Sequence, residues 1–390
     1  MEETIISDLK NIKSVYLDNN ASTPILPEVK ELMNIYIDKF ANPSGIYKAA
    51  KENKMAVESA RANVARLLNA SSQNIVFTSC GSESNNHAIR GVVNGLKEKG
   101  KHLITSEIEH PSVLKTFQHM ETLGFEVSYL KCNSDGIVKP DSLQKAIRKD
   151  TILVSIMLAN NETGAIQPIK ELCEISHNFG ALFHSDAVQA IGKIPVDVKQ
   201  LGVDMLSLSG HKLYAPKGIG VLYVKEGIEL ESLIIGGGQE NGMRAGTENV
   251  IHIMAMGKAA ELAENHIKNS QNIKYLKEKF EKRILEIIPK SRINSANIER
   301  LPNTINLTLP NLQGELFVLA MDKKGVSFSS ASACKAGSKK PSYVLTAMGL
   351  SDEDAHCTIR ISLGIQTKES EISYALEQMR GVVTNFNSMV

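Results

Sequence analysis

The chain has 390 residues, of which 42% are hydrophobic and 22% charged, a composition typical of a globular protein of roughly two to three domains. Lys and Arg total 44 against 43 Asp and Glu, and the formal net charge of +1 argues against a dedicated nucleic-acid-binding protein. No apolar run is long enough to span a bilayer. Residues 1–10 lack a basic head followed by an apolar run, so we expect no signal peptide and a cytosolic location.

The five cysteines are widely spread and show no C-x-x-C spacing. The sequence therefore predicts neither a disulfide framework nor a zinc site, and we expect reduced thiols, one of them available as a reagent. Cys132 and Cys173 suit buried, inert thiols. The full set is Cys80, Cys132, Cys173, Cys334 and Cys357.

Short β-type runs alternate with helical patterns from residue 74 onward, which predicts βαβ units and a mostly parallel sheet. The run 151–157 is apolar on both faces, as a central strand covered by helices requires. We expect strands at 74–78, 102–106, 126–130, 151–157, 182–185, 203–208 and 218–224.

Residues 251–288 contain no Pro and only one Gly, which predicts one or two long helices. The pattern then changes to a smaller α+β domain, with strands at 304–307, 326–328 and 359–363 and helices from 314, around 343–348 and from 368. We therefore predict an α/β protein with a large domain over 15–264 and a smaller domain formed by 1–14 and 265–390.

Two charged side chains follow strands of the predicted sheet, at the edge where open α/β folds bind ligands. Lys212 comes just after the run 205–208, and partial burial there would lower the pKa of its amine and suit it to form a Schiff base. Asp186 follows the preceding strand. A lysine and a carboxylate about one βα unit apart are what pyridoxal phosphate requires. A surface lysine and a helix N-cap are the alternative interpretations.

Polar residues at other strand ends suit a phosphorylated cofactor. Gly81 and Ser82 lie between a strand and a helix N-terminus, where backbone N–H groups can hold a phosphate. Asn161 follows the run 151–157 and can hydrogen-bond a cofactor oxygen, whereas an ordinary Asn-rich turn is the alternative. His110 follows the run 102–106, where an imidazole can stack on a flat ring and move protons, or serve only the structure.

Three further features are candidates for chemistry. The loop 236–249 is Gly-rich and contains Thr247, which suits close approach to an anion or simply a flexible loop. The small-residue stretch 329–338 predicts an exposed, mobile segment with an accessible thiol at Cys334. Arg360 lies inside an apolar strand, and a buried guanidinium requires a carboxylate partner, which an amino-acid substrate offers.

With the motif YLDNNASTP at 16–24, the loop GGGQENGMRAGTEN at 236–249 and SSASAC at 329–334, the chain resembles the NifS/IscS-type cysteine desulfurases, pyridoxal-phosphate enzymes of aminotransferase class V. The resemblance covers nearly the whole chain and implies the fold type I of PLP-dependent aminotransferases. It further implies conversion of L-cysteine to L-alanine with transfer of the sulfur to Cys334 as a persulfide. An acceptor protein, such as an Fe–S scaffold, would then take the sulfur.

The same resemblance implies a role for each site residue. Lys212 would be the Schiff-base lysine, Asp186 the partner of the pyridine nitrogen, and His110 the ring-stacking residue that helps to move protons. Thr247 would reach the phosphate in the neighbouring subunit, which implies a homodimer. The remaining roles fall to the phosphate-site residues Gly81, Ser82, Ser209 and His211, to Gln189 and Asn161 near the ring's phenolic oxygen, and to Arg360 and Asn161 as ligands of the substrate carboxylate.

The chain departs from the family pattern at Tyr47, Ala331 and Lys335, which affects acceptor choice and loop dynamics more than the chemistry. A selenocysteine lyase or an aminotransferase of the same cofactor class is the nearest alternative, and dependence on Cys334 distinguishes it. A catalytically idle sulfur carrier and a Cys/His hydrolase are alternatives of other classes. The sequence identifies neither the acceptor nor the preference for cysteine over selenocysteine.

Overall fold

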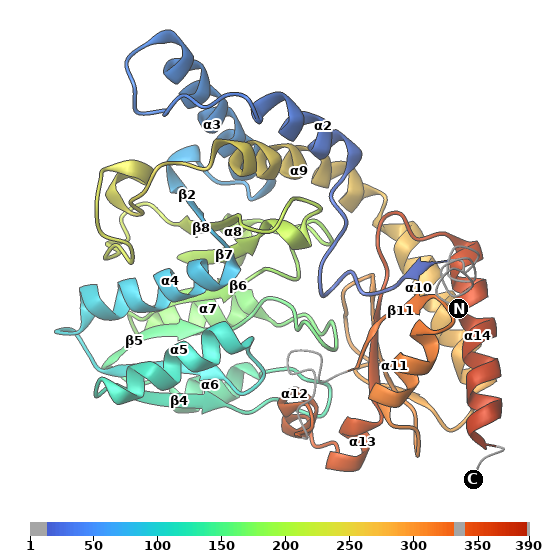
Figure 1. Cartoon of the computed structure of the whole chain (residues 1–390). Helices are drawn as coiled ribbons and strands as arrows, with labels where there is room; N and C mark the ends of the chain where they lie inside the picture. Colours follow the sequence, from blue (N-terminus) through green and yellow to red (C-terminus); the bar gives the residue numbers. More distant parts are fainter. Residues whose placement is uncertain (1–13, 331–339, 388–390) are drawn as a thin grey trace.

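The computed structural model describes residues 14–330 and 340–387. Its larger sheet has seven strands in the order β2-β8-β7-β6-β5-β3-β4 (Figure 1). The strands from β3 to β7 pair in parallel, whereas β8 runs antiparallel to both β7 and β2. The seven strands are β2 (Ile75–Thr78), β3 (His102–Ser106), β4 (Glu126–Leu130), β5 (Thr151–Ser155), β6 (Leu182–Asp186), β7 (Met205–Ser209) and β8 (Gly220–Val224).

The two faces of this sheet pack into separate hydrophobic clusters, because successive side chains of a strand point to opposite faces. Ile104 and Val154 enter one cluster, whereas their neighbours Leu103 and Leu153 enter the other. The first cluster includes residues of α3 (Lys48–Leu67), α7 (Ile169–Asn178) and α9 (Val250–Lys268), and the second those of α4 (Gly81–Leu96) and α5 (Pro111–Thr122). Three shorter helices, α2 (Pro27–Tyr36), α6 (Pro140–Ala146) and α8 (Val198–Leu201), also belong to this part of the chain.

A third cluster forms around a four-stranded antiparallel sheet in the order β12-β13-β10-β9. In Figure 1, α10 (Ser270–Ile287), α11 (Gly314–Asp322) and α14 (Glu369–Asn387) lie together in this part of the molecule. The strands are β9 (Arg292–Ile293), β10 (Thr304–Thr308), β12 (Ser329–Ser330) and β13 (Thr358–Ser362). A small separate cluster contains residues of α12 (Tyr343–Ala347) and α13 (Asp352–His356).

The first described strand belongs to the second part of the chain. β1 (Val15–Tyr16) pairs in parallel with β11 (Val326–Ser327), and Val15 and Leu17 are buried in the cluster around the four-stranded sheet. This packing differs from the domain boundary at residue 15 predicted from the sequence, because the register of a two-residue strand leaves no pattern in the sequence. The boundary near residue 265 remains a prediction, and that residue lies within α9.

The α/β fold with a mostly parallel central sheet is confirmed, and the strands expected at 102–106 and 126–130 match β3 and β4. The long helical segment is two helices, α9 and α10, separated at Asn269. The strand expected at 151–157 ends at Ser155. Within residues 14–330 and 340–387, none of the helices combines the length and apolar character needed to cross a membrane. The cytosolic location remains a prediction.

Candidate active site

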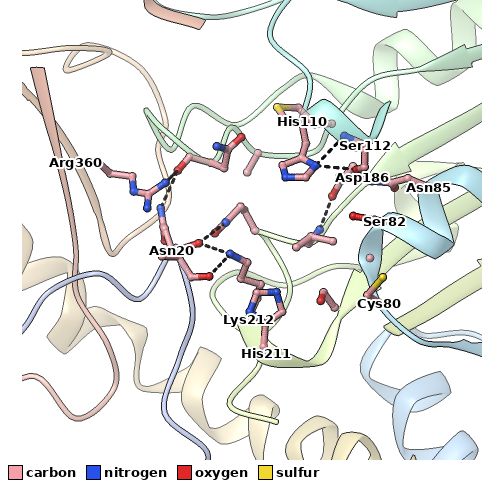
Figure 2. A pocket seen from close by; sticks show the side chains of 18 residues that line it. Asn20, Cys80, Ser82, Asn85, His110, Ser112, Asp186, His211, Lys212 and Arg360 are labelled. Atoms are coloured by element: carbon pink, nitrogen blue, oxygen red, sulfur yellow. Dashed lines mark hydrogen bonds between the residues drawn. The ribbon is translucent and has the colours of Figure 1, made fainter. Parts of the chain in front are cut away.

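A cavity of about 330 Å³ lies at the edge of the seven-stranded sheet, next to the last residues of β6 and β7 (Figure 2). Parallel strands bring their C-terminal ends to one edge, which is why polar residues from separate parts of the chain meet there. Every candidate cofactor and substrate residue except Thr247 lines the cavity. These residues are Gly81, Ser82, His110, Asn161, Asp186, Gln189, Ser209, His211, Lys212 and Arg360.

Asp186, the last residue of β6, is held in place by two donors. Asn85 Nδ2 donates to Asp186 Oδ2 at 2.7 Å, and the backbone N–H of Val188 donates to Asp186 Oδ1 at 2.9 Å. The carboxylate is only 6% exposed and has no cationic side chain within ion-pair distance among the described residues. A buried carboxylate of this kind is suited to pair with a protonated ring nitrogen.

His110 lies opposite Lys212 in the cavity and caps the N-terminus of α5 (Figure 2). Its Nδ1 accepts a hydrogen bond from the Ser112 backbone N–H at 3.1 Å, so the proton of the neutral ring lies on Nε2. Burial lowers the pKa of His110, Asp186 opposes that change, and Lys212 adds to it. The neutral imidazole can therefore exchange a proton through Nε2 near neutral pH.

Lys212 ends the short 3₁₀ helix η2 (Gly210–Lys212) that follows β7. Its Nζ donates hydrogen bonds to the backbone carbonyl oxygens of Asn20 and Ala21, the second at 2.7 Å. The neighbouring His211 lines the same cavity, and burial together with Lys212 lowers its pKa to about 4. The lysine amine is thus held at the cavity by neutral acceptors, next to an imidazole that is uncharged at neutral pH.

The N-terminus of α4 forms a tight cradle at one end of the cavity. A Cβ atom at Gly81 would lie 2.9 Å from Val188 Cγ2 and 3.2 Å from Ser209 Cβ, so a larger residue would push these elements apart. The intrahelical bonds of α4 begin with the N–H of Ser84, and the N–H of Glu83 donates to Cys80 Sγ, so the N–H groups of Gly81 and Ser82 are the donors that the helix start offers to a ligand. With Ser82, Ser209 and His211 beside them, they suit a phosphate group.

Several cavity-lining side chains carry buried polar atoms that have no partner in the described part of the chain. They are Asn85 Oδ1, Asn161 Oδ1 and Arg360 Nε. A buried polar atom without a partner is costly, so such atoms mark places where a ligand completes the hydrogen bonding. Together with the cradle at Gly81, they fit a polar ligand that carries both an anionic group and hydrogen-bonding atoms.

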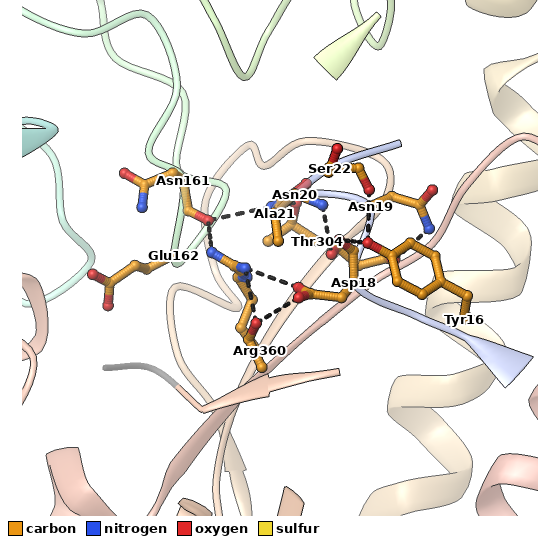
Figure 3. A network of polar contacts seen from close by, with 12 residues as sticks. Tyr16, Asp18, Asn19, Asn20, Ala21, Ser22, Asn161, Glu162, Thr304 and Arg360 are labelled. Carbon is orange, nitrogen blue, oxygen red and sulfur yellow. Dashed lines mark hydrogen bonds and ion pairs between the residues drawn. The ribbon is translucent and has the colours of Figure 1, made fainter. Parts of the chain in front are cut away.

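Arg360 reaches the cavity from β13, and its guanidinium is held by a network between the two sheets (Figure 3). Its NH2 atom lies 2.8 Å from Asp18 Oδ1, and NH1 donates to the backbone oxygen of Asn161 at 3.1 Å. Ser329 Oγ donates to Asp18 Oδ2 at 2.6 Å. The buried guanidinium therefore has an internal carboxylate partner, Asp18, which the sequence interpretation did not foresee, while its Nε atom has no partner in the described part of the chain.

The chain matches the family model described as aminotransferase class-V over residues 15–375. It is 45% identical over 379 residues to the cysteine desulfurase IscS of Dictyoglomus turgidum, an alignment that covers 97% of this chain and 96% of the relative. It is 46% identical over 379 residues to the cysteine desulfurase IscS of Methanosarcina thermophila, with 97% and 94% covered. The chain belongs to the cysteine desulfurase family of class-V aminotransferases.

Solved structures of cysteine desulfurase relatives have the same fold. A NifS-like protein superposes with a TM-score of 0.90 at 35% identity, covering 95% of this chain and all of the other. A structure described as SspA in complex with cysteine gives a TM-score of 0.80 at 40% identity, covering 89% of this chain and 98% of the other.

Two of the predicted desulfurase residues are not among the cavity-lining side chains. Thr247 is exposed, on a loop fixed to the rest of the molecule by the ion pairs Arg61–Glu240 and Arg244–Glu83. Cys334, with the neighbouring Ala331 and Lys335, lies outside the described residues. The described chain approaches Cys334 along β12, where Ser329 pairs with Arg360 in the sheet.

Cys132 and Cys173 match inert thiols rather than a desulfurase nucleophile. Burial raises the pKa of Cys173 to about 12 and that of Cys132 to about 11, although Cys132 is half-buried rather than buried as predicted. Cys80 lines the cavity at the N-cap of α4, where its Sγ accepts the backbone N–H of Glu83 at 3.4 Å.

The sequence interpretation missed three site residues. Asn20 and Asp18 were used only as part of a family motif, but the Asn20 side chain contacts both Asn161 and Thr304, and the Asp18 carboxylate pairs with Arg360. Asn85 supports Asp186 from α4. The sequence spacing could have identified Asn85, because it follows Gly81 by four positions and so lies on the same face of the helix, towards the cavity.

Proposed function

We propose that this chain is a pyridoxal-phosphate-dependent cysteine desulfurase that converts L-cysteine to L-alanine and transfers the sulfur to Cys334. The observation that carries the proposal is the convergence of Lys212, Asp186, His110 and Arg360 on one cavity, in a chain that is 45% identical to a relative named cysteine desulfurase. The cavity combines an amine, a buried carboxylate, a neutral imidazole and a guanidinium, which are the groups this reaction needs.

The cavity residues fit pyridoxal phosphate. Gly81, Ser82, Ser209 and His211 would hold the phosphate, and Asp186 would pair with the pyridine nitrogen. Gln189 and Asn161 would donate to the phenolic oxygen, and Lys212 would bind the aldehyde carbon. When bound, the cofactor supplies an electron sink for the electron pair released at the substrate Cα.

The chain's own residues would then carry out the separate steps of the reaction. Arg360 and Asn161 bind the substrate carboxylate, to which the unpartnered Arg360 Nε and the side-chain NH2 group of Asn161 can donate. The Lys212 amine removes the Cα proton, and His110 exchanges protons through Nε2. The Cys334 thiolate attacks the substrate sulfur: an S–S bond forms, the Cβ–S bond breaks, and Cβ takes up a proton. L-cysteine and the Cys334 thiol thus give L-alanine and a persulfide.

The exposed position of Thr247 agrees with a role towards a second copy of the chain. We infer a homodimer in which Thr247 reaches the phosphate site of the neighbouring subunit. The persulfide on Cys334 would be passed to a sulfur-acceptor protein such as an Fe–S scaffold. Analytical ultracentrifugation of the purified protein tests the dimer, and a monomer that retains full turnover would contradict the shared site.

The function is tested with purified protein incubated with L-cysteine and a thiol reductant. The expected result is a visible absorption band that changes on addition of L-cysteine, with alanine and sulfide formed in equal amounts. Cys334→Ala should keep the band and lose both products. A yellow protein that leaves cysteine unchanged would contradict the desulfurase, and a colourless protein after addition of pyridoxal phosphate would contradict the whole assignment.

A further inference from the structure

Lys193 is a buried lysine, 9% exposed, that lies beside the cavity and has no role in the reaction proposed for this chain. Its Nζ donates to Gln189 Oε1 at 2.7 Å and to Asn20 Oδ1 at 3.0 Å. Both partners are neutral amide oxygens, and the described residues include no carboxylate within ion-pair distance of Lys193. Burial, with contributions from Lys212 and Arg360, sets the pKa of Lys193 well below its ordinary value. A buried amine without a counter-charge is costly, so its retention calls for a reason.

The local structure brings Lys193 and Gln189 together. After β6 the chain makes a helical turn in which Ala190 and Ile191 donate their N–H groups to the carbonyl of Ala187. Gln189 lies in this turn and Lys193 follows it directly, and the amine of Lys193 contacts the side-chain oxygen of Gln189. The turn ends at Gly192, whose φ of +72° is left-handed.

Lys193 and the backbone oxygen of Asn20 together fix which way the Gln189 amide points. An amide can turn over and exchange its oxygen and nitrogen, but a backbone oxygen only accepts and a protonated lysine amine only donates. With Nζ at Oε1, the Nε2 group must take the opposite place, where it donates to the backbone oxygen of Asn20 at 2.9 Å. Nε2 carries a second hydrogen, and the described residues offer it no further acceptor.

The same contacts connect Lys193 to the catalytic lysine. The backbone oxygen of Asn20 accepts from both Gln189 Nε2 and Lys212 Nζ, while its side-chain oxygen accepts from Lys193. Asn20 is 1% exposed and is also bonded through its side chain to Thr304 of the four-stranded sheet, at 2.9 Å. Lys193, Gln189 and Lys212 are therefore held as one unit around a single buried asparagine.

We propose that Lys193 is a positioning residue, which fixes the Gln189 amide so that an N–H donor faces the cavity and meets an acceptor oxygen of the bound cofactor. The inference rests on the proposed function, in which that acceptor is the phenolic oxygen of pyridoxal phosphate. Lys193 itself contacts neither cofactor nor substrate. It acts through Gln189, and its effect disappears when Gln189 can no longer donate.

The test compares the Lys193→Met, Gln189→Glu and doubly substituted enzymes, each reconstituted with pyridoxal phosphate. Methionine keeps the volume and removes the donor, while glutamate keeps an acceptor for Lys193 and removes the N–H group. Each single substitution should shift the absorption maximum of the bound cofactor and lower kcat about fivefold to tenfold, the equivalent of one hydrogen bond. The double variant should lose no more than either single one, within about twofold.

Lys277→Met is the matched control. Lys277 is a buried lysine of α10 that donates to the backbone oxygen of Leu301 at 3.4 Å, outside the cavity. It should leave spectrum and kcat unchanged. Lys193→Arg, which retains donors, should recover part of the loss and serves if the methionine variant does not fold. Losses that multiply in the double variant, or a Lys193→Met enzyme with wild-type spectrum and kcat, would overturn the proposal. A wild-type protein without band or turnover would instead contradict the proposed function.

Discussion

The two sides of the cavity are built in different ways. On the cofactor side, Asp186 and Lys212 follow neighbouring strands of one sheet, and His110 is fixed by Ser112 only two positions away. On the substrate side, Arg360 comes from the other sheet and is held by Asp18, 342 positions away in the chain, and by the backbone of Asn161, 199 positions away. The carboxylate and the imidazole of the cofactor side depend on one sheet edge, whereas Lys212 and Arg360 depend on contacts with the segment 18–21.

The two sides therefore differ in what a substitution is expected to change, the catalytic activity or the free energy of unfolding. On the cofactor side, Asp186 is held by two neutral donors, Asn85 Nδ2 and the Val188 N–H, which can adjust when the carboxylate changes. The guanidinium on the substrate side is buried between two parts of the chain and relies on a single carboxylate. We therefore expect substitutions on the cofactor side to remove activity and leave stability, and substitutions on the substrate side to lower stability.

The largest expected effect is that of Asp186→Asn. Loss of the carboxylate should lower kcat by about two to four orders of magnitude, as removal of a group that tunes proton transfer does. Stability should change little, because Asn85 can turn its amide so that the unpartnered Oδ1 accepts from the new side-chain NH2 group. The rate of alanine formation measures the loss of activity, and the thermal midpoint measures the change in stability. A fall of the thermal midpoint as large as the one predicted below for Asp18→Asn would contradict the expected difference between the two sides of the cavity.

The second prediction concerns the buried pair on the substrate side. Asp18→Asn leaves the guanidinium of Arg360 buried without a counter-charge, which should lower the free energy of unfolding by about 3 kcal/mol. Thermal unfolding of the variant and the wild type under identical conditions measures the change.

Asp150→Asn is the matched control for Asp18→Asn and has the smallest expected effect on stability. Its pair with Arg148 is exposed, with side chains 43% and 50% accessible, so its loss should change stability by only about 0.5 kcal/mol. Equal shifts in the two variants would contradict the distinction between a buried and an exposed pair.

The fourth prediction concerns how the free energy of unfolding depends on pH. Glu109 is fully buried, its Oε1 accepts from Ser106 Oγ and the Met157 N–H, and burial raises its pKa from 4.5 to about 8. Between these values the folded state holds a proton that the unfolded state has released, so the free energy of unfolding falls as the pH rises. Glu109→Gln removes the titration. Its thermal midpoint should therefore fall less than that of the wild type between about pH 5 and pH 8. An equal fall of the thermal midpoint with pH in the two proteins would contradict the assignment of this titration to Glu109.

The central sheet could be predicted because its strands are short apolar runs between polar turns. β3 and β4 match their expected bounds for that reason. The strand at 151–157 was predicted too long because Ile156 and Met157 are apolar and buried, although strand pairing has already ended. A hydrophobic pattern reports burial, which continues past the last paired residue.

The cofactor side of the site was predictable from the positions of Lys212, Asp186 and His110 after strands. The substrate side was only partly predictable: the sequence indicates that Arg360 needs a carboxylate and does not indicate which one. Asp18 meets Arg360 only because β1 joins the second part of the chain. Lys193 was missed although it lies in the apolar run AIGKIPV at 190–196, because its partners Asn20 and Gln189 are brought to it only by the fold.

The central claim is that sulfur passes from L-cysteine to Cys334. The most direct measurement is a single turnover with L-cysteine and no reductant, followed by trapping of thiols, proteolysis and mass spectrometry of the Cys334 peptide. The account predicts one added sulfur on that peptide and an equal amount of alanine, with neither formed by Cys334→Ser. Alanine formed at the wild-type rate by Cys334→Ser, or the added sulfur found on Cys80 instead, would contradict it.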